Sequence, residues 1–354
     1  MAPGVTPSNE NGTRLSNAGK ILVCVLVLLG LLTSCRRKSD IAREATITVY
    51  GFSVAKEPLE NQIVPAFKES WEKKTGQPLT ITTSFAGSEM VTNQIVSGVE
   101  ADLAILAIER NAQRLLDTKA TRSDWRTLPY HGIVNKTPMV ILVRKGNPLR
   151  IRDFADLGKP GVRVIHPDPT SSGAGQWSLL AIYGSEIIKS EYRKDERDEK
   201  AAFALLQKVW KNVIATPESA RAARTQLERG EGDVLVTYEL EALQLIVDKK
   251  LPFEIVTPQC TIMSEHPVVI IDHGMTPAKY ALVELFARSL WDEPAQRAWV
   301  KSYFRSINFE QLNESNPRFV KVNLPFTVSN LGGWERAYPE IIEGVWKNQI
   351  QATK

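Results

Sequence analysis

The sequence has few of the residues from which most metal and enzyme sites are built. It contains three cysteines and four histidines in 354 residues, and His131, His166, His266 and His273 include no closely spaced pair. A zinc motif and a nucleophile–base pair both need such residues at recognisable spacings. We therefore predict no metal, no cofactor and no catalytic residue.

The three cysteines leave no pair for an internal disulfide. Cys24 lies in an apolar N-terminal run, Cys35 lies at its end, and Cys260 stands alone far downstream. The chain must then fold by burying apolar side chains, which its 43% hydrophobic content allows. Cys260 has two interpretations, a sulfur-transfer nucleophile or an inert buried thiol. We favour the buried thiol because no basic neighbour in the sequence would lower its pKa.

An excess of one charge sign is also missing. The formal net charge is +4, and residues 1–34 contribute +1 of it through Arg14, Lys20 and Glu10, which leaves +3 for the rest. That excess is too small for a nucleic-acid-binding surface, so we predict no nucleic-acid partner.

The longest apolar run is a leader and not a membrane span. Ile21 to Leu32 follows basic residues and ends in Thr33-Ser34-Cys35, the arrangement of an export signal. Leu32-Thr33-Ser34-Cys35 resembles a bacterial lipoprotein box, which implies a signal peptide at 1–34, a lipid on Cys35 and a tether at 35–45. The alternative is an uncleaved signal anchor that ends in an incidental cysteine.

Downstream of the tether, apolar runs alternate with amphipathic segments, which predicts an α/β protein with mostly parallel sheets. The length after residue 35 indicates two domains. Two extended, proline-containing stretches, 135–139 and 253–263, are candidate crossings between the domains. Ordinary surface loops are the alternative for both.

One short stretch, "DPTSSGAGQW" at 168–177, brings hydroxyls and glycines to the start of a predicted helix. The first N–H groups of a helix lack intrahelical partners and carry a partial positive charge, so they attract anions. Ser172 can cap the helix or contact a ligand, and Gly173 and Gly175 allow close approach on either side of Ala174. A simple helix cap is the alternative.

The same pattern of strand, small or hydroxyl residues and then helix recurs at Gly51-Phe52-Ser53, Ala86-Gly87-Ser88 and Glu218-Ser219-Ala220. In open α/β sheets, ligands bind beyond the carboxyl ends of strands, so these helix starts are expected to face one cleft.

These motifs, together with "EKKTGQPLTITTSFAGS", "GVEADLAILAI", "ILVRKGNP", "ERGEGDVLVTYELEAL" and "LGGW", resemble the bacterial sulfate- and thiosulfate-binding proteins that serve ABC importers. The resemblance covers nearly all of residues 46–346. It implies a two-lobed periplasmic-binding-protein fold of type II with the ligand between the lobes. The implied first lobe is 46–134 plus 260–354, and the implied second lobe is 135–259.

The resemblance also implies which groups hold the dianion. Ser88 and Ser172 would supply hydroxyls, and Gly173 and Ala174 backbone N–H groups. Ser53 stands where the family usually has an aspartate that uses its backbone N–H.

Two more positions follow from the same resemblance. Ser219, or Ala220 if a one-residue gap is placed there, would be another backbone donor. Tyr238 aligns with the family's tryptophan indole, and its phenol can still donate a hydrogen bond.

Two departures from the family bear on which anion binds. "GAGQW" has Ala174 and Gln176 where glycine and arginine are usual, and "SFAGSEMV" lacks the glycine pair and lysine that usually surround the serine. Glu89, directly after Ser88, carries a carboxylate that can accept a hydrogen bond. Sulfate has no proton and suits a pocket of donors only, whereas hydrogen phosphate needs an acceptor. Glu89 would favour phosphate if it points into the pocket; as a first-turn helix residue it is more often exposed to solvent.

We therefore predict a lipid-anchored, monomeric extracytoplasmic binding protein for sulfate or thiosulfate that closes by a hinge and delivers its ligand to an ABC permease. Phosphate or molybdate binding and an anion-sensing ectodomain are the alternatives.

Overall fold

The computed structural model describes Met1, residues 46–194 and residues 196–353. The predicted signal peptide, the lipid site at Cys35 and the tether lie outside these residues. From Ile47 onward, the contacts join the chain into one unit.

Within the described residues, eleven strands form one mixed sheet with the order β2-β1-β3-β9-β4-β7-β5-β6 along its main path. The strands are β1 (Thr46–Phe52), β2 (Thr80–Ala86), β3 (Leu103–Ile105), β4 (Ile133–Arg144), β5 (Val164–Ile165), β6 (Val213–Ala215), β7 (Val234–Tyr238), β8 (Phe253–Val256), β9 (Cys260–Ile270), β10 (Arg305–Ser306) and β11 (Leu324–Phe326).

Helices cover this sheet, as the alternating sequence pattern predicts. The α-helices are α2 (Lys56–Pro58), α3 (Val64–Thr75), α4 (Ser88–Val96), α5 (Glu109–Asp117), α6 (Gly173–Lys194), α7 (Glu199–Lys211), α8 (Ala220–Glu228), α9 (Glu239–Leu243), α10 (Pro277–Ser289), α11 (Glu293–Lys301), α12 (Glu310–Glu314) and α13 (Trp334–Ala337). The shorter or wider helical segments are η1 (Ser53–Ala55), η2 (Leu59–Ile63), η3 (Trp125–Thr127), η4 (Pro129–Gly132), η5 (Phe154–Gly158), η6 (Gln244–Asp248), η7 (Val328–Leu331), η8 (Tyr338–Ile350) and η9 (Gln351–Thr353).

Local sequence sets where these helices begin and end. In α3, Phe67 and Trp71 pack against the core from one side of the helix. Gly76 then ends α3 with a φ of 68°, a left-handed conformation that glycine adopts without strain, and its N–H donates to the Glu72 carbonyl at 2.8 Å.

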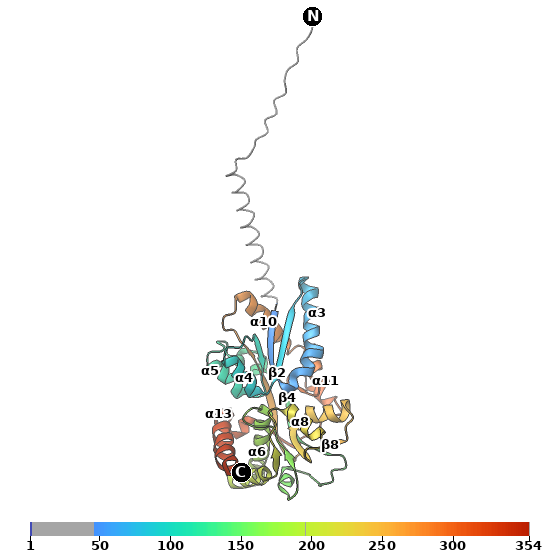
Figure 1. The fold of residues 1–354 in the computed structure, drawn as a ribbon, viewed down its shortest axis with the longest axis vertical. Coiled ribbons are helices and arrows are strands. Elements are labelled where there is room, and N and C mark those ends of the chain that lie inside the picture. The colour runs from blue at the N-terminus through green and yellow to red at the C-terminus, as the bar shows by residue number, and fades with distance from the viewer. Residues whose placement is uncertain (2–45, 195, 354) are drawn as a thin grey trace. The chain divides into compact units, whose positions relative to one another are not determined.

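Two lobes surround different parts of the sheet (Figure 1). We call β1–β3 with η1, α2, α3, α4, α5, α10 and α11 the first lobe, and β5–β8 with α6–α9 the second lobe. The two-lobed α/β fold that the sequence predicts is confirmed.

The long strands β4 and β9 run through both lobes and make the sheet mixed. β4 pairs antiparallel with β9 from Ile133 to Pro138, and then with β7 and β8 from Met139 to Arg144. Within the lobes, β1 pairs parallel with β3, and β5 pairs parallel with β6 and β7. β11 also pairs parallel with β9, and every antiparallel pair among the described strands involves β4 or β9, so the sheet is mixed and not mostly parallel as the sequence predicts.

The C-terminal segment lies on the second lobe. η8 packs against α6 and α7, and the Trp210 indole donates to the Gln351 side chain at 2.7 Å. Trp210 and Trp346 meet edge to face at 5.3 Å. The predicted lobe boundaries stay a prediction, and for this tail the contacts favour the second lobe.

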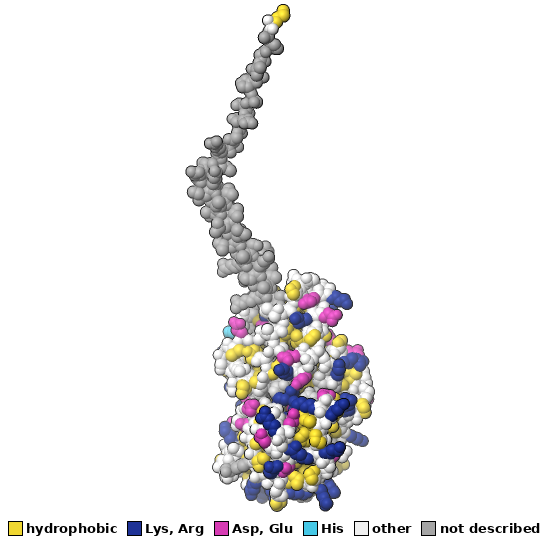
Figure 2. Space-filling model, turned by 45° about the vertical axis from the view of Figure 1, so that its right-hand side comes forward, with side chains coloured by type: hydrophobic (Ala, Val, Ile, Leu, Met, Phe, Trp, Pro, Cys, Tyr) yellow, Lys and Arg dark blue, Asp and Glu magenta, His cyan; other side chains and the backbone are white. Residues whose placement is uncertain are grey.

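None of the helices in the described part of the chain is long and apolar enough to cross a membrane. Figure 2 shows Lys and Arg side chains interspersed with Asp and Glu on one face of the folded part. This distribution agrees with the small net charge of +4.

Candidate functional site

The start of α6 leaves two backbone N–H groups without helical partners. The Ser172 N–H donates to the Asp168 carbonyl at 2.8 Å, and the Ser172 carbonyl accepts the N–H of Gly175 at 3.0 Å. Gly173 and Ala174, the first two residues of α6, precede the first intrahelical bonds. Their N–H groups therefore point out of the helix along its positive end.

Gly173 brings this helix start against the first lobe. A Cβ on Gly173 would lie 2.5 Å from Ala107 Cβ and 3.5 Å from Ser88 Cβ, so only glycine fits. Ser88 begins α4 and is buried, and its Oγ accepts the Ala107 N–H at 3.0 Å. Ser88 also donates to Asn111 Oδ1 at 2.9 Å. The structure thus brings together Ser88 and Gly173, as the resemblance implies.

Ser53 and Ser219 lie on two elements that pack together. Ser219 caps α8, and its Oγ accepts the Ala222 N–H at 3.1 Å. Ser53 begins η1, which packs against α8. Both serines line a cleft of about 600 Å³. Its walls are Ser53, Lys56, Phe85, Ala86, Gly87 and Met90 from the first lobe and Glu218, Ser219, Arg221, Ala222, Thr225, Gln226 and Arg229 from the second.

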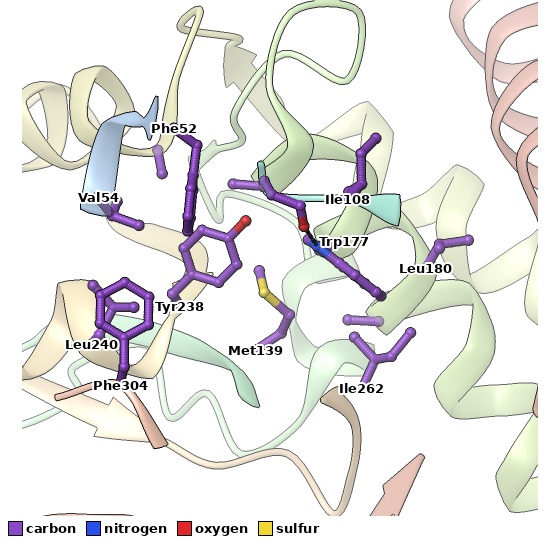
Figure 3. Packing of buried hydrophobic residues seen from close by; sticks show 14 of the residues in the cluster. Phe52, Val54, Ile108, Met139, Trp177, Leu180, Tyr238, Leu240, Ile262 and Phe304 are labelled. Atoms are coloured by element: carbon purple, nitrogen blue, oxygen red, sulfur yellow. Dashed lines mark hydrogen bonds between the residues drawn. The ribbon is translucent and has the colours of Figure 1, made fainter. Parts of the chain in front are cut away.

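Tyr238 contributes a buried hydroxyl without a partner. Its side chain is fully buried at the end of β7, and its OH has no hydrogen-bond partner among the described residues. The hydroxyl points toward the side of the core where Ile108 and Trp177 lie (Figure 3). Burial, with the nearby Glu241 charge, raises the pKa of Tyr238 well above its usual value, so the phenol keeps its proton and remains a donor.

Glu89 is not exposed to solvent, so that sequence-based alternative is wrong, and its carboxylate oxygens meet protein donors. It is buried, and Oε1 accepts Gln176 Nε2 at 2.9 Å and Arg110 Nη1 at 3.1 Å. Arg114 Nη1 lies 3.5 Å from Oε2. We call Glu89, Arg110, Arg114 and Gln176 the Glu89 cluster. It joins α4 and α5 of the first lobe to α6 of the second.

Two further contacts hold the lobes together, and sequence reasoning predicted neither. Arg221 of α8 makes a bidentate ion pair with Glu57 of α2, with Nη2 to Oε2 at 2.8 Å. Burial raises the pKa of Glu57, but its hydrogen bond and charge interaction with Arg221 outweigh that effect and lower it. The Trp177 indole N–H donates across the lobes to the Ala107 carbonyl at 2.7 Å.

Two residues of the enzyme alternative, Cys260 and His266, lie in the core. Cys260 is buried, and burial raises the pKa of its thiol to about 12 despite the nearby Lys189. His266 is buried as well, and burial lowers its pKa to about 3. Within residues 46–194 and 196–353, no group of three or more His, Cys, Asp or Glu side chains is arranged to hold a metal ion.

Known proteins with similar sequences identify the family of this chain. A family model described as "Bacterial extracellular solute-binding protein" matches residues 47–305. A sulfate-binding protein of Escherichia coli is 32% identical, over 88% of this chain and 94% of that protein. A thiosulfate-binding protein of Pseudomonas aeruginosa is 31% identical, over 76% of this chain and 81% of that protein.

A solved structure extends the likeness to the whole fold. The sulfate-binding protein SubI of Mycobacterium tuberculosis superposes with a TM-score of 0.74 at 28% identity, over 83% of this chain and 98% of that one. Three observations point to the same family: the fold, the helix starts that meet between the two lobes, and the sequence similarity. The chain therefore belongs to the bacterial extracellular solute-binding proteins.

Proposed function

We propose that this chain binds sulfate or thiosulfate between its lobes and delivers the anion to an ABC permease. The observation that carries this proposal is a set of hydrogen-bond donors between the lobes. It comprises the first N–H groups of α6, which lie against Ser88, and the buried Tyr238 hydroxyl, which has no partner among the described residues. A desolvated dianion needs donors of this kind, and no chemical bond is made or broken.

The proposed ligand-binding residues are those that the resemblance implies. Ser88 and Ser172 supply hydroxyls, Tyr238 supplies its phenol, and Ser53, Gly173, Ala174 and Ser219 supply backbone N–H groups. Four relatives named sulfate-binding, at 27–33% identity, and the thiosulfate-binding relative support this class of ligand.

The Glu89 cluster supports sulfate over phosphate. Hydrogen phosphate would need an acceptor for its proton, and Glu89 is the carboxylate next to Ser88. Two arginines and Gln176 already occupy its oxygens. A carboxylate held in this way would have to break charge-assisted hydrogen bonds before it could accept a proton from a ligand.

The sequence supports the proposed location outside the cytoplasm. A signal peptide at 1–34 would be removed, a lipid on Cys35 would anchor the protein to a membrane, and 35–45 would be the tether. Labelling with a radioactive fatty acid, which Cys35→Ser should abolish, tests the anchor.

A calorimetric titration of residues 36–354 with sulfate, thiosulfate, phosphate and molybdate tests the ligand. We expect tight, selective binding of sulfate or thiosulfate. Ser172→Ala should weaken binding by roughly tenfold by removing one hydroxyl, and Gly173→Pro should weaken it more by removing a backbone donor. Unchanged affinity in both variants would refute the proposed site.

A further inference from the structure

The Ser88 hydroxyl has one proton, and in this structure that proton is directed away from the ligand site. Ser88 Oγ accepts the Ala107 N–H at 3.0 Å and donates to Asn111 Oδ1 at 2.9 Å. A hydroxyl can donate once and accept twice. Because Ser88 already donates its hydrogen bond to Asn111, only one lone pair of Oγ remains. Ser88 can then accept a hydrogen bond from a ligand but cannot donate one to an anion.

Asn111 itself is half satisfied. Its side chain is fully buried, its Oδ1 accepts from Ser88, and its Nδ2 has no hydrogen-bond partner among the described residues. A buried amide nitrogen without a partner is costly, because it has lost its hydrogen bonds to water and gained none in return. A turn of the carboxamide about its terminal bond would exchange the oxygen and the nitrogen at nearly the same positions.

After that turn, Nδ2 would donate to Ser88 Oγ, which would then accept two hydrogen bonds, from Ala107 and from Asn111. The Ser88 hydroxyl would keep its proton and could donate it in a hydrogen bond to a third partner. Ser88 Cβ lies 3.5 Å from a Cβ built on Gly173, so this hydroxyl lies beside the first N–H group of α6, where the ligand is proposed to bind.

We propose that Asn111 is a specificity-determining positioning residue, whose amide orientation decides whether Ser88 offers the ligand a donor or an acceptor. The inference rests on the proposed function. With Nδ2 toward Ser88, the site presents a donor and selects a fully deprotonated oxyanion. With Oδ1 toward Ser88, it presents an acceptor and tolerates an oxyanion that carries a proton.

Asn111→Asp tests this directly. An ionised carboxylate cannot donate a hydrogen bond, so it can only accept one from the Ser88 hydroxyl and keeps that hydroxyl from donating to the ligand. The readout is the ratio of sulfate to phosphate affinity, measured by calorimetry at a mildly alkaline pH, where both anions carry two negative charges and phosphate retains one proton. Repulsion by the new carboxylate acts about equally on both anions, so it cancels in the ratio.

We expect Asn111→Asp to shift this ratio toward phosphate by about tenfold or more. Asn111→Leu has neither donor nor acceptor and leaves the Ser88 proton free, so its ratio should stay within about threefold of the unmodified protein. The double variant Ser88→Ala/Asn111→Asp should lose the shift because the hydroxyl is gone. Circular dichroism melting checks that each variant folds.

A purely structural role for Asn111 predicts equal losses for both anions in the Asp and Leu variants, with no change in ratio. That result, or a shift that persists without Ser88, would overturn the inference and leave the proposed function standing. If the unmodified chain binds none of the tested oxyanions, the proposed function fails and the inference fails with it.

Discussion

At the scale of single residues, the Tyr238 hydroxyl is the donor whose role is easiest to isolate. It is fully buried and has no partner among the described residues, so its removal breaks no contact of the ligand-free protein. We expect Tyr238→Phe to weaken sulfate binding by about tenfold or more, the effect of losing one hydrogen bond to a charged group.

The free energy of unfolding separates this effect from general damage. Without ligand, Tyr238→Phe should be neutral or stabilising by up to about 1 kcal/mol, because a buried hydroxyl without a partner is no longer desolvated. Calorimetry and urea unfolding of the same samples give both values. Loss of stability with full affinity would show that the hydroxyl serves the core and not the ligand.

Glu265 on β9 makes stability depend on pH. Burial, together with repulsion by Glu109, raises its pKa from 4.5 to about 7, although Lys136 opposes the shift. Between these two values the folded chain keeps a proton that the unfolded chain has released, so stability falls as pH rises from about 4.5 to about 7.

Glu265→Gln removes this titration. The variant should be more stable than the unmodified chain by on the order of 1–3 kcal/mol at about pH 8, with the difference vanishing near pH 4.5. Urea unfolding at several pH values measures it. Parallel stability curves for the two proteins would contradict the assignment.

At the scale of elements, the sequence predicted most of the fold and the helix starts at which we propose the site. Helix starts such as Ser172-Gly173 and Ser219 are written in consecutive residues, so cap and glycine rules find them. Contacts between distant segments cannot be found by such local rules. Glu57 and Arg221 lie 164 residues apart, and no local pattern links them.

Glu89 shows the same limit in a residue that the sequence had already singled out. A helix-start carboxylate is ordinarily exposed, but here Gln176, 87 residues away, donates to it from the other lobe. Asn111 was missed because its role depends on Ser88, 23 residues earlier, and a lone asparagine in a helix carries no signal. In each case, pairing across the fold and not local propensity decides the role.

The Glu89 cluster should contribute to affinity through α6. Gln176 Nε2 donates to Glu89 at 2.9 Å and to the Pro169 carbonyl at 3.1 Å, so Gln176→Ala loses the contact between lobes. We expect sulfate binding to weaken by roughly three- to tenfold, because the closed state loses one of the hydrogen bonds that stabilise it relative to the open state. Calorimetry measures the loss.

Gln176→Arg is the matched control, since arginine is the residue that the resemblance gives as usual there. An arginine can donate to Glu89 and should restore most of the affinity. If Gln176→Ala binds as tightly as the unmodified chain, the Glu89 cluster has no part in closure.

At the scale of the whole molecule, ligand binding and lobe closure should be one event, and Gly87 offers a way to separate them. A Cβ on Gly87 would lie 2.6 Å from the Ser171 carbonyl oxygen and 2.9 Å from that of Glu218, both on the second lobe. Gly87 has an ordinary φ of −60°, so alanine suits the backbone and meets an obstacle only when the lobes close.

Gly87→Ala should therefore leave each lobe intact and prevent full closure. Small-angle X-ray scattering should show that sulfate reduces the radius of gyration of the unmodified chain but not of Gly87→Ala, whose affinity should fall by at least about tenfold. Gly158→Ala is the matched control, because its Cβ would lie 2.9 Å from Lys208 Cβ within the second lobe. That variant should lose stability yet still close, since crowding inside one lobe does not oppose the approach of the other. Equal compaction of Gly87→Ala and the unmodified chain would mean that the anion is bound without the contact between Gly87 and the second lobe.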